Sequence, residues 1–234
     1  MRVAILQSNY IPWKGYFDII GSVDLFIFHD DLQYTKGDWR NRNKIKTPKG
    51  AEWITVPCGS DEHRLICDVD LSGKDWQRKH WHSIRANYAN APYFKQYSHF
   101  FERFFIDQEW SNLSDMNQHI IKSICTELLG ITTRFEDSRS YHLKSTKGAR
   151  VIELLKKAKA DVYLSGPSAK SYLSNVSFAA EGINLEWMNY DSYPEYPQLY
   201  PPFEHAVSII DLFFNVGPDA PLFMKHAKMA RPTW

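Results

Sequence analysis

The apolar positions near the start of the chain fall into two short runs separated by a polar loop. Residues 3–6 form the first run and residues 25–28 the second, and runs of this length are typical of buried strands. The loop between them contains Pro12, and residues 16–22 then have the spacing of two helical turns. Strand, loop, helix and strand predict a βαβ unit, which requires a parallel sheet covered by helices.

Hydrophobic periodicity becomes helical in the middle of the chain. Residues 53–56 predict another strand, stopped by Pro57, and apolar stripes of helical spacing then extend over residues 74–130, closed by Gly130. We therefore predict that residues 1–234 form a single α/β domain. Its parallel, Rossmann-like sheet is flanked by helices, with a mostly helical insert at about residues 74–130.

The C-terminal third of the chain returns to alternating strands and helices. Residues 151–158 have the apolar spacing of a helix, and Ser208 opens a last helix with a capping-box-like partner in Asp211. That helix is predicted to end near Gly217. Strands are predicted at residues 131–135, 161–164 and 184–188.

The overall composition is that of a globular protein without a general attraction to polyanions. The net charge is +1 and 44% of the residues are hydrophobic, so we expect neither nucleic-acid nor membrane binding, and phosphate recognition must be local. No apolar run approaches the roughly 18 residues of a membrane span, and residues 1–7 do not form a signal peptide. The three cysteines lack zinc-ligand spacing, and Cys58 is interpreted as a small buried filler. We predict a cytoplasmic protein without a metal site.

A polar and aromatic block follows the second predicted strand at residues 30–46. It combines two adjacent carboxylates with Tyr34, Trp39, several amides and several cations. Ligands of parallel α/β sheets bind beyond the C-terminal ends of the strands, and this block begins at such an end. The mixture of rings, amides and cations predicts a site for a polar, phosphorylated ligand that contains a ring.

The cations of this block follow an alternating pattern. Arg42, Lys44 and Lys46 alternate with Asn43 and Ile45. In an extended segment the three cations share one face, where together they can hold a diphosphate through charge-assisted hydrogen bonds. The alternative interpretation is a solvated basic edge strand, for which alternating charges are common.

Titratable residues at two places are candidates for proton transfer. His29 precedes the paired carboxylates Asp30 and Asp31, and His205 lies just before the last predicted helix. A histidine beside a carboxylate is a natural general base near neutral pH. The alternatives are a structural histidine in each case, and a helix cap or an ion pair with nearby cations for the two carboxylates. The turn at Ser165 and Gly166 also presents backbone N–H groups suited to an anion.

Several of these segments together resemble the WbqC-like family of bacterial O-antigen and surface-polysaccharide gene clusters. The resemblance covers nearly the whole chain in order, and departs from the family at Ser8, where the family usually has proline. The segments that carry it are VAILQSNYIPWKGYF at residues 3–17, DDLQY at 30–34, Trp39, NRNKIK at 41–46, APYF at 91–94, YLSGP at 163–167, YPQ at 196–198 and SIIDLFFNVGP at 208–218.

The resemblance implies an N-aminoacyltransferase, glycyl in the leading case. It would take the acyl group from a thioester on the phosphopantetheine arm of an acyl or peptidyl carrier protein, and hold no cofactor of its own. The acceptor would be the amine of a nucleotide-linked sugar of the dTDP-4-amino-4,6-dideoxy type. The alternatives are a nucleotidylyltransferase-like enzyme, although Trp13 and Lys14 stand where that family has histidines, and a non-catalytic scaffold that binds nucleotide sugars.

On this resemblance the residues divide into two roles. The expected general base is His205, with His29 or Asp30 behind it, and a backbone N–H is expected to stabilise the oxyanion. The residues expected to bind the substrate are Gln7, Tyr10, Trp13, Asp31, Gln33, Tyr34, Lys36, Trp39, Asn41, Arg42, Asn43, Lys46, Ser165, Gly166 and Gln198.

Overall fold

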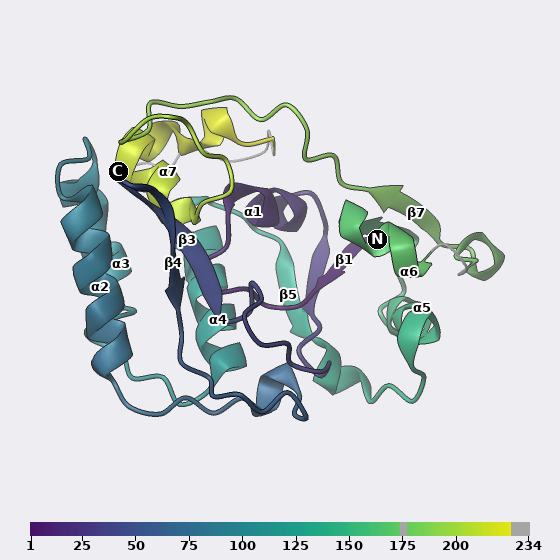
Figure 1. Ribbon diagram of the computed structural model, residues 1–234. Helices are drawn as coiled ribbons and strands as arrows, with labels where there is room; N and C mark the ends of the chain where they lie inside the picture. Colours follow the sequence, from purple (N-terminus) through teal and green to yellow (C-terminus); the bar gives the residue numbers. More distant parts are fainter. Residues whose placement is uncertain (174–176, 226–234) are drawn as a thin grey trace.

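The main sheet has five strands, all parallel, in the computed structural model, which describes residues 1–173 and 177–225. The order across the sheet is β5-β2-β1-β6-β7, so the first strand of the chain lies in the centre (Figure 1). The predicted α/β fold with a parallel sheet is therefore confirmed. The strands are β1 (Arg2–Leu6), β2 (Leu25–Phe28), β5 (Arg134–Asp137), β6 (Val162–Ser165) and β7 (Asn184–Trp187).

Helices cover both faces of this sheet, because successive side chains of a strand point to opposite faces. Ala4 and Phe26 pack on one face with residues of α1, α4 and α7, whereas Val3 and Leu25 pack on the other with residues of α5. Phe26 is fully buried, which stabilises the fold by about 2 to 3 kcal/mol. The helices are α1 (Lys14–Gly21), α2 (Asp75–Tyr88), α3 (Phe94–Glu102), α4 (Leu113–Ser123), α5 (Lys147–Lys157), α6 (Lys170–Leu173) and α7 (Ile209–Val216).

The order of connections creates a switch point at the centre of the sheet. From β1 the chain passes through α1 to β2 on one side, and from β5 it returns through α5 to β6 on the other side of β1. The loops that leave β1 and β6 therefore diverge to opposite faces at their carboxyl ends. In open parallel sheets a crevice at this point is the usual place for a ligand.

A second, antiparallel sheet is formed by the hairpin of β3 (Arg42–Thr47) and β4 (Gly50–Thr55). Figure 1 shows this hairpin with α2 and α3 toward one end of the molecule, and α5 and α6 beside β7 at the other. The range predicted as a helical insert contains α2, α3 and α4. A π-helical stretch (Ile124–Leu128) directly follows α4. The closing residue Gly130 has a positive φ of 61°, as the predicted helix end requires.

Two details differ from the sequence-based prediction. The strand expected at residues 131–135 is β5 and begins only at Arg134, because the Thr133 hydroxyl donates to the carbonyls of Ile20 and Val23 and fixes the preceding residues as a loop. At the start of α7, Ser208 accepts a hydrogen bond from Ile210 N as predicted. The acidic half of the expected capping box is wrong, since the side chain of Asp211 points into a buried polar cluster instead.

Candidate functional site

A cavity of about 700 Å³ lies at the carboxyl ends of β1, β2 and β6, at the switch point of the sheet. Its walls come from the loop after β1, the first turns of α1 and α5, and the turn after β6. This volume is ordinary for a site that binds a small molecule. The lining residues are Ile5, Leu6, Gln7, Asn9, Trp13, Tyr16, His29, Leu32, Arg40, Lys147, Gly148, Arg150, Val151, Tyr163, Ser165, Gly166, Pro167, Ser168, Ala169 and Tyr190.

The loop after β1 is held in a strained conformation by buried side chains. Ile11 has a φ of 35°, which is unfavourable for a β-branched residue and persists only where surrounding contacts enforce it. Asn43 Nδ2 donates to the carbonyls of both Tyr10 and Ile11 at 2.9 Å, and Ser8 N donates to Asp30 Oδ1 at 2.7 Å. Asn43 and Asp30 therefore position the loop that forms one wall of the cavity.

Aromatic side chains form another part of the wall. The Trp13 ring contacts the Tyr190 ring edge to face, with 5.2 Å between the centroids. A Cβ atom at Gly15 would lie 2.3 Å from the Trp13 ring, so this position has to be glycine for the indole to lie over the start of α1. Tyr16 donates from its hydroxyl to the carbonyl of Gln7 at 2.9 Å, which joins helix and loop. The rings are thus fixed before any ligand arrives.

The buried His29 and the half-buried Asp31 and Arg150 form a polar cluster at the cavity. Arg150 Nε donates to His29 Nε2 at 3.2 Å, and its Nη2 donates to Asp31 Oδ2. Ser138 donates to the other oxygen of the same carboxylate. Burial lowers the pKa of His29 to about 4, so the ring is neutral at pH 7. Because a guanidinium can only donate, the proton of the neutral ring lies on Nδ1.

Asp30 has a structural environment, away from the cavity lining. Its fully buried carboxylate accepts hydrogen bonds from Ser8 N, from Ser114 Oγ at 2.5 Å and from Gln118 Nε2 at 3.2 Å. Burial raises the pKa of Asp30, although these hydrogen bonds act in the opposite direction. The carboxylate therefore ties the loop after β1 to α4.

The hairpin cations do not form the open three-cation face that their alternation predicted. The Arg42 guanidinium lies 4.1 Å and the Lys44 ammonium 5.2 Å from the centre of the Trp53 ring. Lys46 is 2% exposed and donates to the carbonyl of Pro202. The expectation is corrected because the first two cations stack on an aromatic neighbour and the third is buried against a carbonyl. None of the three lines the cavity.

Other predicted binding residues are engaged in internal contacts. Tyr10 is buried with its hydroxyl 2.8 Å from His80 Nδ1, and Asn41 Nδ2 donates to the carbonyl of Val56 at 3.0 Å. Tyr34 is fully buried, so its ring presents no free face for stacking. Gln33, Lys36 and Trp39 lie at the surface. Gln33 donates to the Glu62 carbonyl. Trp39 is 39% exposed, and its ring centroid lies 5.0 Å from that of Trp53.

The C-terminal candidates lie outside the cavity as well. His205 is exposed and contacts the Phe203 ring, and partial burial together with the charge of Lys14 lowers its pKa. Gln198 Nε2 donates to the buried carboxylate of Asp211 at 2.8 Å. That carboxylate also accepts from the hydroxyls of Tyr88 and Tyr196, so the segment is a packed polar cluster.

The structure thus brings together one part of the predicted set. The sequence gives a visible signal for the missed Asn9 and Tyr16, which flank the predicted loop, but none for Tyr190. Lys147 and Arg150 lie in the first turn of α5. The apolar spacing of residues 151–158 predicted this helix but not the part of these two cations in the cavity. Predicted residues in the cavity are Gln7, Trp13, His29, Ser165 and Gly166, and missed ones are Asn9, Tyr16, Arg40, Lys147, Arg150 and Tyr190.

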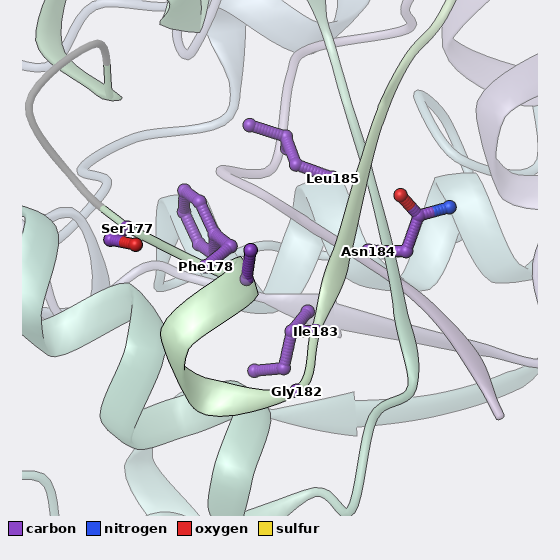
Figure 2. Close-up of a pocket in the computed structure, with 7 residues that line it drawn as sticks. Ser177, Phe178, Gly182, Ile183, Asn184 and Leu185 are labelled. Atoms are coloured by element: carbon purple, nitrogen blue, oxygen red, sulfur yellow. The ribbon is translucent and has the colours of Figure 1, made fainter.

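A second hollow, of about 570 Å³, lies at the amino end of β7. Figure 2 shows that Phe178, Ile183, Asn184 and Leu185 of this hollow come from one short segment of the chain. Its lining has no charged side chain and none of the predicted site residues. Across residues 1–173 and 177–225, no cluster of three or more His, Cys, Asp or Glu residues is placed to hold a metal ion. In the same part of the chain no helix has the length and hydrophobicity to cross a membrane.

The chain therefore has a Rossmann-like α/β fold with a cavity at the switch point of its parallel sheet. The chain belongs to the WbqC-like protein family, whose model matches residues 7–222, and the predicted family is confirmed. It is 44% identical over 229 residues to "Uncharacterized protein Rv1507c" of Mycobacterium tuberculosis (strain ATCC 25618 / H37Rv). That match covers 97% of this chain and 99% of the other. No solved structure matches the chain.

Proposed function

We propose that this protein is a cytoplasmic N-aminoacyltransferase of O-antigen or lipopolysaccharide biosynthesis. It moves an acyl group, glycyl in the leading case, from a carrier-protein thioester to the amine of a nucleotide-linked sugar of the dTDP-4-amino-4,6-dideoxy type. The observation that supports this best is the cavity at the switch point, whose lining mixes rings, amides and cations. Such a lining suits a ligand that has a base, a sugar and phosphates. Membership of the WbqC-like family is the second support.

The proposed reaction needs positioning more than activation. The neutral amine attacks the thioester carbonyl carbon, a C–N bond forms, the C–S bond breaks, and the thiol leaves with a proton. Holding the amine against the thioester turns a bimolecular step into an effectively intramolecular one. Gln7 and Asn9 lie on the wall that the strained loop fixes, so their amides are preorganised to orient the sugar hydroxyls.

We place the proton acceptor for this step at His29. Its ring lines the cavity and is uncharged at neutral pH, whereas His205 is exposed and lies outside the lining. Nε2 of His29 accepts a hydrogen bond from Arg150 Nε, and in the proposed step it exchanges this hydrogen bond for the proton while the guanidinium stays paired with Asp31. His29→Asn should lower kcat at least tenfold and His205→Asn should leave it unchanged. Loss of turnover in the second variant alone would return the role to His205.

A thermal-shift panel followed by a turnover assay tests the proposed function. The panel contains ATP and CTP with Mg²⁺, dTDP, a dTDP-amino sugar and a charged carrier protein. We expect stabilisation by the dTDP-amino sugar and formation of its N-acylated product when charged carrier is added. A response to ATP or CTP alone would favour the nucleotidylyltransferase alternative. Binding of the dTDP-amino sugar without turnover would favour the non-catalytic scaffold.

A further inference from the structure

We infer that the cavity holds the phosphate groups of its ligand with Arg40 and Lys147, and not with the hairpin cations Arg42 and Lys44. The ligand class is an organic diphosphate. The inference rests on the proposed function for the identity of the whole ligand, but the phosphate site itself is argued from the charges and contacts of the cavity.

The charged residues of the cavity lining are all basic. Arg40, Lys147 and Arg150 line the cavity, and no aspartate or glutamate is among the lining residues. A concave, partly enclosed wall concentrates the field of its charges and strengthens their attraction for an anion. Two carboxylates pair with these cations, Asp31 with Arg150 and Asp38 with Arg40, and neither of them lines the cavity.

The three cations differ in how far they are already engaged. Arg150 uses its donors on Asp31, on His29 and on the Ser145 carbonyl, so it serves mainly to build the wall. Lys147 is exposed at the first position of α5 and has no ion pair within the described ranges 1–173 and 177–225. It is therefore available to a ligand without breaking an existing contact.

Two buried polar atoms of the lining have no hydrogen-bond partner among the residues that the structure describes. Arg40 pairs through Nη1 with Asp38 at 3.2 Å, yet its Nε is buried without a hydrogen-bond partner in the part of the chain that the structure describes. Asn9 Oδ1 is likewise buried without a partner there, and so is Arg42 Nε, but Arg42 does not line the cavity. Buried donors and acceptors in folded proteins are nearly always paired, so an unpaired donor on a cationic wall indicates a site for an acceptor oxygen.

The surrounding backbone and hydroxyls complete the phosphate site. Lys147 and Gly148 open an 11-residue helix whose N-cap residue Thr146 makes no side-chain hydrogen bond to it, so the first N–H groups remain available beside the two cations. Ser165 and Ser168 of the turn after β6 line the same cavity and add hydroxyl donors. Charged and neutral donors of α5, of the turn after β6 and of Arg40 thus line the same cavity.

The test is isothermal titration of the full chain with dTDP and with inorganic pyrophosphate. We expect binding of dTDP, an affinity about tenfold lower in Arg40→Gln and in Lys147→Gln, and a larger loss in the double variant. Lys156→Gln, on the same helix and paired with Glu181 outside the cavity, is the matched control and should bind as the wild type does. Pyrophosphate should bind more weakly with the same dependence on Arg40 and Lys147.

Three results would overturn the inference. These are no binding of either probe, unchanged affinity in both cavity variants, or a tenfold loss in Arg42→Gln with none in Arg40→Gln. Circular dichroism of each variant separates a folding defect from a binding defect. Lys147 is the decisive position, because its exposed side chain has no ion pair to lose among residues 1–173 and 177–225. If dTDP binds as expected while no acyl transfer is found, the phosphate site stands and the proposed function fails.

Discussion

Two regions of this protein combine aromatic rings with cations, and they differ in how far those cations contact other side chains. On the β3–β4 hairpin, Arg42 and Lys44 lie over the ring of Trp53. In the cavity at the switch point, Lys147 and part of Arg40 have no partner within residues 1–173 and 177–225. In the same residues Arg42 Nε is also buried without a hydrogen-bond partner. The two hairpin cations nevertheless both lie over a ring, whereas Lys147 forms no ion pair or cation–π contact there.

The difference teaches that residue types alone do not identify a ligand site. A cation stacked on tryptophan gains about 0.5 to 1 kcal/mol at an exposed position, and this gain opposes its use by a ligand. A buried donor without a partner costs about 1 to 3 kcal/mol, which an incoming acceptor oxygen recovers. The two regions are separated by position and contact, because Arg42 and Lys44 lie over a ring outside the cavity, whereas Arg40 and Lys147 line it.

The largest expected effect concerns the support behind the cavity. Asp30→Ala removes the carboxylate that accepts from Ser8 N, Ser114 and Gln118, and leaves these donors buried and unpaired. We expect the free energy of unfolding to fall by about 3 to 5 kcal/mol, measured by urea denaturation. Asp107→Ala, at an exposed position, should change it by less than about 0.5 kcal/mol. A stable Asp30→Ala variant that has lost only turnover would make Asp30 a catalytic residue.

A somewhat smaller effect is expected from the residue that joins the two regions. His80 Nδ1 contacts the Tyr10 hydroxyl beside the cavity loop, and His80 Nε2 contacts the carbonyl of Thr55 in β4 at 3.2 Å. Burial lowers the pKa of His80 to about 4, below its unfolded value of about 6.5. The unfolded chain thus takes up the proton first, so the stabilisation is complete above about pH 6.5 and is lost as the pH falls toward 4.

The measurement for His80 is the loss of unfolding free energy between pH 7 and pH 5. The histidine should account for about 2 kcal/mol of that loss in the wild type, and His80→Gln should remove this part. His82→Gln, an exposed position on the same helix, should leave the pH dependence as it is. An unchanged slope in His80→Gln would mean that hairpin and cavity loop are not coupled through this ring.

The fold was predictable to the extent that it depends on local periodicity. The apolar runs at residues 3–6 and 25–28 fall on β1 and β2, because strands buried on both faces need continuous apolar residues. The start of β5 was missed by three residues, since the Thr133 hydrogen bonds that delay it link residues more than a hundred positions apart. Nothing in local spacing encodes such a contact.

The candidate site was predictable only where it follows a strand directly. Gln7, His29 and Ser165 stand at or just beyond the ends of β1, β2 and β6, and the rule for parallel sheets located them. Lys147 enters the cavity because α5 crosses the sheet, which depends on strand order. The pairing of Lys46 with Pro202 is likewise a tertiary contact, invisible in an alternating pattern.

A third prediction compares the aromatic rings of the two regions. Trp13→Ala removes the ring that lines the cavity and contacts Tyr190, and should lower the affinity for dTDP about tenfold, since stacking on a base contributes roughly 1 to 3 kcal/mol. Titration calorimetry measures this, with Trp53→Ala on the hairpin as the comparison. Equal losses in both variants would show that the ligand spans the two regions.

The smallest expected effect lies within the hairpin itself. Trp53 is 40% exposed, and its ring contacts Arg42, Lys44 and Trp39. Trp53→Ala should lower the free energy of unfolding by about 1 to 2 kcal/mol, through lost cation–π and ring contacts at a half-exposed site. Arg42→Gln should cause no further loss in the Trp53→Ala background, because the two groups stabilise the fold through the same contact. Additive losses in the double variant would mean that Arg42 has a second partner. The hypothesis that the hairpin binds a ligand would then be open again.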